Sequence, residues 1–193
     1  TYEKVANDIS YGFLFNKYTL LNTPSPKGQN NTTKLKYQKI SNKDIYINEY
    51  IIHNKGNFYD EDGNYYDWVE LYNNSSKDIE LNNLYLTDNP NTLNKYKLPN
   101  ITLKNNEYII IYLSGESKTI DDTIYANFKL SKDDELILSN GKKIIDKVKI
   151  IDLPDNISYG RKDGTWYYFT SPTPGKINNT ASFTSLGGTK WAY

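Results

Sequence analysis

Cysteine and methionine are absent from this sequence of 193 residues, and histidine and arginine each occur once. Without cysteine the chain cannot form a disulfide or a thiolate zinc site, and a lone histidine excludes a metal site built on two imidazoles. No G-x-S-x-G motif accompanies His53, so we expect a surface histidine rather than a member of a catalytic triad. Because an initiator methionine is also missing, we expect the sequence to be a segment of a longer protein.

The sequence also has no excess of charge and no long apolar run. Its 23 basic and 23 acidic residues cancel, so it has no basic footprint and we expect no nucleic-acid partner. No apolar stretch approaches the roughly 20 residues of a membrane-spanning helix, so we expect no membrane partner either. Leu, Ile, Val and Phe still amount to 46 residues, which is sufficient for a polar but folded chain.

Helical periodicity is missing as well, since no stretch has apolar residues at helical spacing over even three turns. Apolar and polar residues instead alternate through Val69, Glu70 and Leu71, and the alternation resumes at Ile79 and Leu81 after a polar turn cluster. The sequence therefore predicts an all-β fold, an antiparallel sandwich of short strands. Further strands are predicted at 45–52, 84–89, 96–99, 101–103 and 108–113, the last one apolar throughout and therefore expected to be covered on both faces.

Asn140-Gly141 is the strongest local turn signal and predicts a hairpin with a type I′ turn. A two-residue loop would place Ile137 opposite Ile144 and make both faces apolar near the turn. Two alternatives remain open: either both faces are covered, or a bulge near Asp146 resets the register.

Several strings in this chain, in the same order, resemble the lamin tail domain as it occurs in secreted bacterial proteins. They are I-N-E at 47–49, D-W-V-E-L-Y-N at 67–73, L-T-D at 86–88 and N-F-K-L-S at 127–131. The resemblance implies an immunoglobulin-like β-sandwich without enzymatic chemistry. It also implies a non-catalytic interaction or spacer module of a larger secreted or cell-surface bacterial protein, and hence an extracellular or cell-surface location.

An internal repeat at an offset of 148 residues defines the expected domain organisation. The matching segments are 7–12 with 155–160, 23–26 with 171–174, and 30–32 with 178–180. In the second copy they are similar to the closing I-S-Y-G strand and P-T-P-G turn of a lamin tail domain.

We therefore expect residues 1–31 to be the closing strands of a preceding lamin-tail repeat and 32–44 to be a linker. Residues 45–178 would form a complete domain, and 179–193 a linker to a following domain. Strands without their own sheet seek partners, so residues 1–31 are expected to lie along the domain or to pair with a neighbouring chain as a dimer.

No motif predicts catalysis, and we expect this protein not to be an enzyme and to use no cofactor. Glu49 and Glu70 could act as paired carboxylates, but their strand positions favour a role as acceptors of backbone hydrogen bonds. Ser139 and Lys142 fit S-x-x-K, a motif that works on a helix, whereas here it spans a tight turn.

One acidic loop is a candidate for calcium. Asp60, Asp62 and Asn64 stand at alternating positions, Gly63 permits a sharp bend, and Asp67 follows. The twelfth position of the loop is not glutamate and no helices flank it, so a solvated turn is the favoured interpretation and no metal is expected.

The 19 tyrosines are the other candidate feature. A sheet face with several tyrosines could stack on sugar rings or on a partner peptide, and the possible contributors are Tyr46, Tyr50, Tyr65, Tyr66 and Tyr72. A tyrosine-rich composition explains them without a ligand and is the favoured interpretation. The protein or carbohydrate partner is therefore unspecified. The alternatives to the spacer role are a carbohydrate-binding module, or an accessory domain of a secreted hydrolase, nuclease or spore-coat kinase-like protein.

Overall fold

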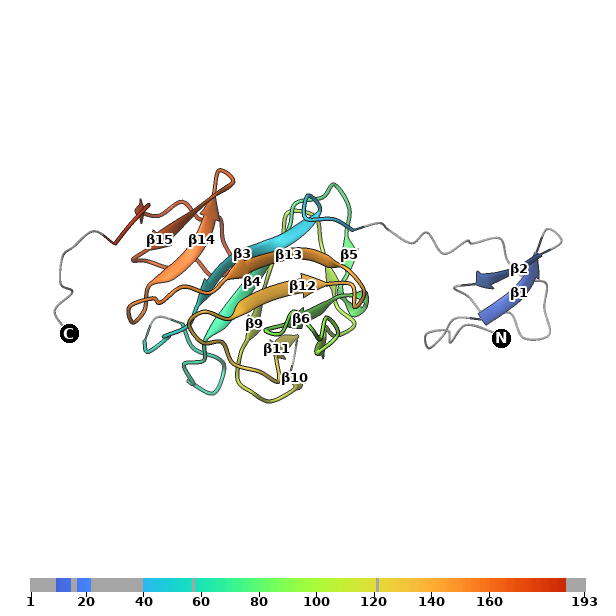
Figure 1. The fold of residues 1–193 in the computed structure, drawn as a ribbon, viewed down its shortest axis with the longest axis horizontal. Helices are drawn as coiled ribbons and strands as arrows, with labels where there is room; N and C mark the ends of the chain where they lie inside the picture. Colours follow the sequence, from blue (N-terminus) through green and yellow to red (C-terminus); the bar gives the residue numbers. More distant parts are fainter. Residues whose placement is uncertain (1–9, 15–16, 22–39, 57, 121, 187–193) are drawn as a thin grey trace. The chain divides into compact units, whose positions relative to one another are not determined.

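The computed structural model describes residues 10–14, 17–21, 40–56, 58–120 and 122–186 (Figure 1). The chain divides into two compact units between Lys39 and Ile40. Residues 32–39 of the predicted linker at 32–44, the repeated turn at 23–31 and the last residues, 187–193, lie outside the described residues. Among the described residues there is no α-helix, and none forms a helix that is long and apolar enough to cross a membrane.

The first unit contains one antiparallel hairpin, made of β1 (Ser10–Leu14) and β2 (Lys17–Leu21). Ser10 pairs with Leu21 and Leu14 pairs with Lys17, which leaves two residues between the strands.

The second unit is built around a large sheet with the strand order β10-β11-β9-β4-β3-β14-β15-β16. All neighbours in it are antiparallel except β11 and β9. In sheet order the strands are Lys118–Ile120, Thr123–Tyr125, Tyr108–Tyr112, Trp68–Asn73, Ile45–Ile51, Ser158–Lys162, Thr165–Phe169 and Ser182–Phe183. The sheet therefore extends past position 178, where the sequence placed the end of the domain.

A smaller sheet lies against the middle of the large one, with β12 and β13 in front of β3 and β4 (Figure 1). Its strand order is β13-β12-β6-β7, and the strands are Ile144–Lys149, Glu135–Ser139, Tyr85–Thr87 and Tyr96–Lys97. A further two-stranded ladder joins β5 (Ile79–Glu80) to β8 (Thr102–Leu103), and a single 3₁₀ turn, η1 (Leu81–Asn83), follows β5. Two layers of this kind, antiparallel except for the β11–β9 pair, form the predicted immunoglobulin-like sandwich.

The main core lies between the two sheets and follows from the alternation seen in the sequence. Val69 and Leu71 of β4 point inward, where they join Leu136 and Leu138 of β12 in one fully buried cluster. Burying a side chain of this size stabilises the fold by about 1.5–3 kcal/mol relative to leaving it exposed.

The opposite face of the large sheet has its own apolar cluster, because the segment 54–67 covers one end of it. Ile51, Trp68, Tyr112 and Tyr125 are buried there, and Phe58 packs on them from the covering segment. This second layer explains why β4 is buried on both faces. Strand β9 is covered on both faces only at its C-terminal end, because Tyr108, Ile109 and Ile110 are half-buried.

The β12–β13 hairpin differs from the two-residue loop that Asn-Gly predicted. Ser139 pairs with Ile144, so the loop spans four residues, and the side chain of Asn140 holds this wider turn by accepting the backbone N–H groups of Lys142 and Lys143. The register then shifts between Ser139 and Leu138, which pairs with Asp146. Of the two alternatives, the bulge next to Asp146 is the one that occurs.

The two halves of the internal repeat have the same backbone pairing. Strands β14 and β15 begin and end 148 residues after β1 and β2. Their register corresponds too, because Ser158 pairs with Phe169 as Ser10 pairs with Leu21. The sequence repeat thus extends to strand bounds and pairing.

Candidate functional site

The central feature of the candidate site is a pair of glutamates on adjacent strands. Strand β3 has an irregularity at Asn48, so that Ile47 pairs with Leu71 but Glu49 pairs with Glu70. Side chains alternate along a strand, and one extra residue therefore moves Glu49 from the core face to the outer face, directly opposite Glu70. Both side chains have no exposed surface.

Glu49 is enclosed by donors from the C-terminal part of the chain. The hydroxyl of Ser158 donates to Oε1 of Glu49. The N–H of Thr173 lies 3.2 Å from Oε2, and the Thr173 hydroxyl lies 3.1 Å from the same oxygen. This carboxylate therefore fastens the segment that follows β15 onto the outer face of the large sheet.

Glu70 fastens the next part of the same segment. Its Oε2 accepts the N–H of Gly175 at 2.5 Å, and its Oε1 accepts the side-chain amide of Asn48 at 2.7 Å. Gly175 has a φ of 75°, in the left-handed region that glycine adopts without strain. The role as acceptors of backbone hydrogen bonds, which the strand positions favoured, is thus observed for both glutamates.

The two carboxyl groups titrate abnormally because they are buried next to each other. Burial raises the pKa of Glu70 to about 8, and the neighbouring Glu49 contributes to the rise. Burial also raises the pKa of Glu49, although the hydrogen bonds from Ser158 and Thr173 oppose this effect. No ion pair to either group occurs in the described residues. Burial therefore favours the protonated form of Glu70 over the ionised form.

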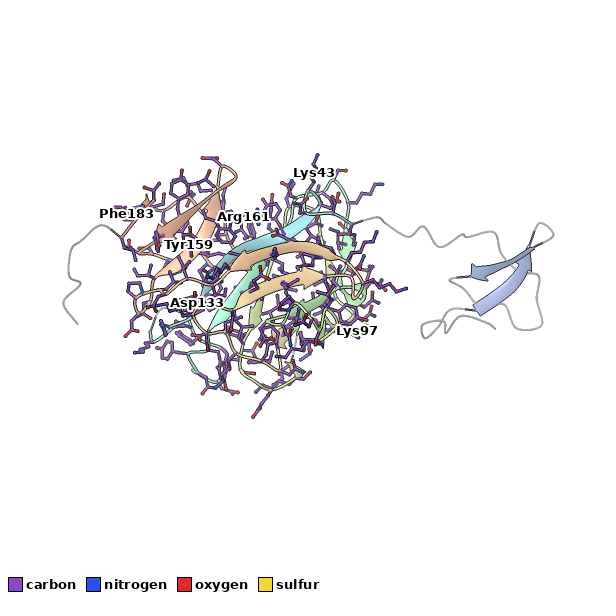
Figure 2. All side chains as sticks on the ribbon, viewed as in Figure 1. Lys43, Lys97, Asp133, Tyr159, Arg161 and Phe183 are labelled. Atoms are coloured by element: carbon purple, nitrogen blue, oxygen red, sulfur yellow. The ribbon has the colours of Figure 1, made fainter. Side chains whose placement is uncertain are left out.

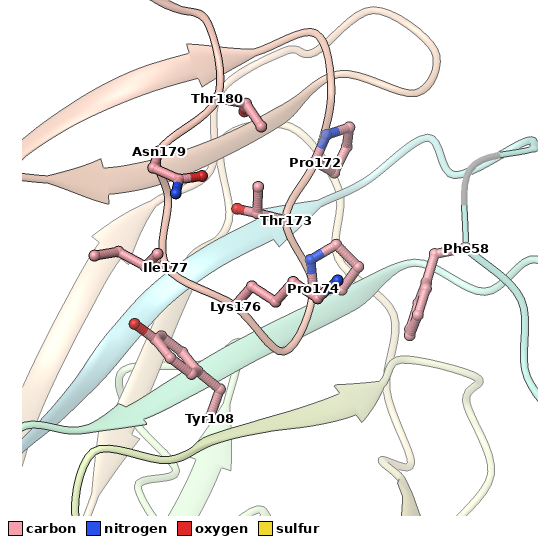
Figure 3. Close-up of a pocket in the computed structure, with 9 residues that line it drawn as sticks. All are labelled: Phe58, Tyr108, Pro172, Thr173, Pro174, Lys176, Ile177, Asn179 and Thr180. Carbon is pink, nitrogen blue, oxygen red and sulfur yellow. The ribbon is translucent and has the colours of Figure 1, made fainter.

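A groove of about 810 Å³ lies beside residues 172–180, which we call the fastened segment (Figure 3). The segment runs across β3 and β4 and returns, and Tyr108 of β9 and Phe58 of the covering loop complete the walls (Figure 3). The side chain of Ile177 is 63% exposed at its rim. The groove is mainly apolar, and Glu49 and Glu70 do not line it, so it offers a contact surface rather than an acid–base site.

Arg161 forms a second polar cluster, next to the bulge of β3. β14 pairs with β3 only at Tyr50 and Glu49, so Ile47 has no strand partner on that side. The Ile47 N–H donates to Oδ2 of Asp146 at 2.9 Å, and the Ile47 carbonyl accepts Nε of Arg161 at 2.9 Å. Nη2 of Arg161 contacts both Asp146 oxygens at 2.8 and 2.9 Å. The ion pair thereby supplies hydrogen-bond partners to the backbone N–H and carbonyl groups of Ile47, which have no strand partner on that side.

The surroundings of Arg161 are aromatic, and Figure 2 labels it on β14 together with Tyr159. Its guanidinium carbon lies 4.9 Å from the ring centre of Trp166 and 5.2 Å from that of Tyr46. Sequence reasoning noted this residue only as the lone arginine. The signal that could have identified it is the choice of arginine over lysine, because a planar guanidinium is suited to buried, stacked ion pairs.

Gly160 and Asn178 connect the two clusters. The side-chain amide of Asn178 donates to the Arg161 carbonyl at 2.9 Å and its oxygen accepts the Thr173 hydroxyl at 2.7 Å. This close approach requires glycine at position 160, because a Cβ there would lie 2.5 Å from Nδ2 of Asn178. Asn178 is therefore the link between the fastened segment and β14.

The predicted calcium residues are arranged as a hydrogen-bonded turn. Asp60 is only 3% exposed, and its carboxylate accepts the N–H groups of Asp62 and Asn64 and the hydroxyl of Tyr125. Burial would raise the pKa of Asp60, but these hydrogen bonds outweigh burial and lower it. Asp67 instead accepts the N–H of Asn54. No group of three or more metal-ligating side chains occurs in the described part of the chain.

Calcium is therefore expected to leave the thermal stability of this protein unchanged. Asp60 already receives hydrogen bonds from protein donors, and Asp62 is exposed, so millimolar calcium should shift Tm by less than about 1 °C in calorimetry. Asp60→Ala should lower stability by about 1–3 kcal/mol, because it leaves buried donors unpaired, and Asp62→Ala should be neutral. A rise of several degrees with calcium that Asp62→Ala abolishes would contradict this expectation.

The structure keeps His53, Ser139 and Lys142 apart from the glutamate pair. His53 is exposed, with Nε2 3.9 Å from a carboxylate oxygen of Asp152. Ser139 is fully buried and donates to the carbonyl of Leu93. Lys142 is exposed in the β12–β13 turn.

The five tyrosines singled out in the sequence do not form one surface. Tyr50 is fully buried, while Tyr66 packs on the inner tyrosines of the second cluster. Tyr46 and Tyr72 lie edge to face with ring centres 5.6 Å apart. Tyr65 is 47% exposed on the covering loop. Of these five tyrosines, only Tyr65 has enough exposed surface to stack on a ligand.

Fold and site together define an immunoglobulin-like β-sandwich in which the domain's own C-terminal segment covers Glu49 and Glu70. Residues 38–152 match the family model for the Lamin Tail Domain. This is more than half of the chain, and the chain therefore belongs to the lamin tail domain family, which is not known as catalytic. No curated protein matches the chain. The match ends before β14, so the closing hairpin and the fastened segment lie outside the matched range.

Proposed function

We propose that this protein is a non-catalytic interaction and spacer module of a larger secreted or cell-surface bacterial protein. The observation that carries the proposal is the burial of Glu49 and Glu70, the pair of carboxyl groups that the sequence suggested for hydrolysis. Glu49 and Glu70 are completely buried, and their oxygens accept hydrogen bonds from the domain itself. Paired carboxylates act on a substrate only if the substrate can reach them. Here they bind the domain's own C-terminal segment instead.

The internal repeat supports a tandem arrangement, with residues 1–31 as the end of a preceding domain of the same kind. Strands β1 and β2 have the bounds and register of β14 and β15. Repeated domains joined by short segments extend a chain in steps of constant length, which is the property a spacer needs.

To test the absence of catalysis, the wild type and the variants Glu49→Gln and Glu70→Gln are each assayed with polysaccharides, nucleic acids and phosphomonoesters. We expect no turnover that depends on either glutamate, because neither carboxyl group reaches solvent. A hydrolysis that both substitutions reduce by 100-fold or more, which is of the order that general acid–base groups contribute, would contradict the proposal. Fractionating cells of the source bacterium tests the location. We expect the protein in the medium or at the cell surface.

A carbohydrate-binding role is the second candidate, and one observation favours it. Tyr59 and Tyr65 are 61% and 47% exposed on the covering loop, with ring centres 5.9 Å apart. Exposed aromatic rings of this kind can stack on sugars. Titration with soluble cell-wall glycans tests this role, and Tyr65→Ala should weaken any binding at least about tenfold. Binding that survives this substitution would place the sugar site elsewhere.

A further inference from the structure

One edge of the large sheet, strand β16, is open to a further strand. It is the last strand in the sheet order, and β15 is its one partner among the described residues. The β14–β15 end of the sheet, which carries β16, extends beyond the small sheet (Figure 1). An edge strand in such a position offers its free backbone N–H and C=O groups to another strand.

The other edge strands of the two sheets differ from β16, because each of them carries lysine. In the described part of the chain these strands are β10, with Lys118, β13, with Lys147 and Lys149, and β7, with Lys97. Lysine on an edge strand opposes pairing with another chain. Residues 177–186, by contrast, contain no charged residue and no proline. Two copies of this chain could therefore meet at β16 without bringing like charges together, which are destabilising when directly opposite.

A row of aromatic side chains crosses four strands of the large sheet and ends at this edge. Tyr50 of β3 pairs with Tyr159 of β14, Tyr159 pairs with Tyr168 of β15, and Tyr168 pairs with Phe183 of β16. Residues that are directly opposite each other lie on one face of a sheet. The ring centres of Tyr50 and Tyr159 are 6.0 Å apart, and those of Tyr159 and Tyr168 are 4.9 Å apart.

Exposure increases along this row toward the edge. Tyr50 is fully buried, Tyr159 and Tyr168 are half-buried against the main core, and the side chain of Phe183 is 48% exposed. An aromatic ring stabilises most when its apolar surface is covered and when it packs on another ring. A strand added beside β16 would cover the exposed end of the row.

We propose that β16 is a docking edge for a second copy of this chain, which adds its own β16 in antiparallel orientation. A two-fold axis beside Phe183 places the Phe183 rings of the two copies opposite each other, so that the aromatic row continues from one sheet into the next. In a two-fold pair each copy presents the same surface, and this surface is uncharged. The pairing needs only the fold of the domain, and it does not depend on the spacer role.

Sedimentation of the full chain over a range of protein concentrations tests the pairing. Two short strands form a small interface, and interfaces below about 1,200 Å² are typically weak, so we expect the dimer to form between roughly 0.1 and 1 mM protein. Hydrogen exchange at residues 182–184 should slow by at least about twofold over the same range, because pairing protects the backbone N–H groups. A chain that stays monomeric up to about 1 mM would overturn the proposal.

Phe183→Lys and Phe183→Glu test whether the two Phe183 side chains are opposite each other. Each variant places like charges across the two-fold axis and should weaken the dimer at least about tenfold. Because Phe183 is exposed, both variants should keep the fold, which circular dichroism and Tm check. An equal mixture of the two variants at low ionic strength should associate at least about threefold more tightly than either variant alone, since lysine then faces glutamate. A mixture that associates no better than the single variants would contradict the two-fold pairing.

Ile120→Lys is the matched control for the edge. Ile120 is 42% exposed on β10, at the opposite edge of the same sheet. This substitution adds the same charge at a similar exposure and should leave the dimer unchanged. A dimer that Ile120→Lys removes and Phe183→Lys leaves intact would place the pairing at β10 and overturn the proposal, as would a dimer that survives both substitutions.

Discussion

Gly160→Val should destabilise the domain by about 3 kcal/mol or more, the largest effect we expect from a single substitution outside the main core. A Cβ at position 160 would lie 2.5 Å from Nδ2 of Asn178, 3.1 Å from Cγ of Glu49 and 3.2 Å from Cε2 of Phe169. Overpacking of this kind costs about 1–3 kcal/mol. Displacing Asn178 also removes its hydrogen bonds and leaves buried groups unpaired, at about 1–3 kcal/mol more.

Urea unfolding of wild type and Gly160→Val measures this difference in the free energy of unfolding. Gly56→Ala is the matched control, because its added Cβ would meet only Nδ2 of Asn156, at 4.0 Å. That substitution should be neutral or should stabilise by up to about 1 kcal/mol, since it reduces the entropy of the unfolded chain. Equal stability of the valine variant and the wild type would mean that Asn178 does not connect the closing segment to β14 in solution.

Replacing Glu70 by glutamine should raise stability at pH 8 and flatten the dependence of stability on pH. Burial raises the pKa of Glu70 from its ordinary value of 4.5 to about 8. Between these two values the folded state binds more protons than the unfolded state, so stability falls as the pH rises. The slope for one such group reaches about 1.4 kcal/mol per pH unit. The wild type should therefore be more stable at pH 5 than at pH 8.

In Glu70→Gln this loss should disappear, because the amide has no charge to bury and Asn48 can turn its own amide to match it. We expect the variant to exceed the wild type by about 1–3 kcal/mol at pH 8 and to equal it near pH 5. Glu116→Gln, at an exposed position, serves as the control and should leave the pH profile unchanged. Chemical unfolding at several pH values provides the measurement. A wild type that gains stability between pH 5 and pH 8 would contradict the raised pKa of Glu70.

Much of the sandwich is predictable from local sequence patterns. Alternation in Val69, Glu70 and Leu71 identifies β4 and its inward face, because side chains of a strand alternate whatever its partners are. The Asn140-Gly141 turn identifies the β12–β13 hairpin, although Asn140 holds a four-residue loop by accepting two backbone N–H groups. Strands β10 and β11 were not predicted, and the parallel pairing of β11 with β9 is not local.

The candidate site, like the fold, was predictable from the sequence only in part. The sequence by itself determined the strand positions of Glu49 and Glu70, the internal copy and the residues that the two closing segments share. Only the tertiary structure decided that the glutamates face each other, because this depends on one extra residue in β3. It also decided that Arg161 meets Asp146, 15 residues earlier in the chain and on the other sheet. Such contacts depend on how two sheets pack, and a local pattern of residues does not predict that packing.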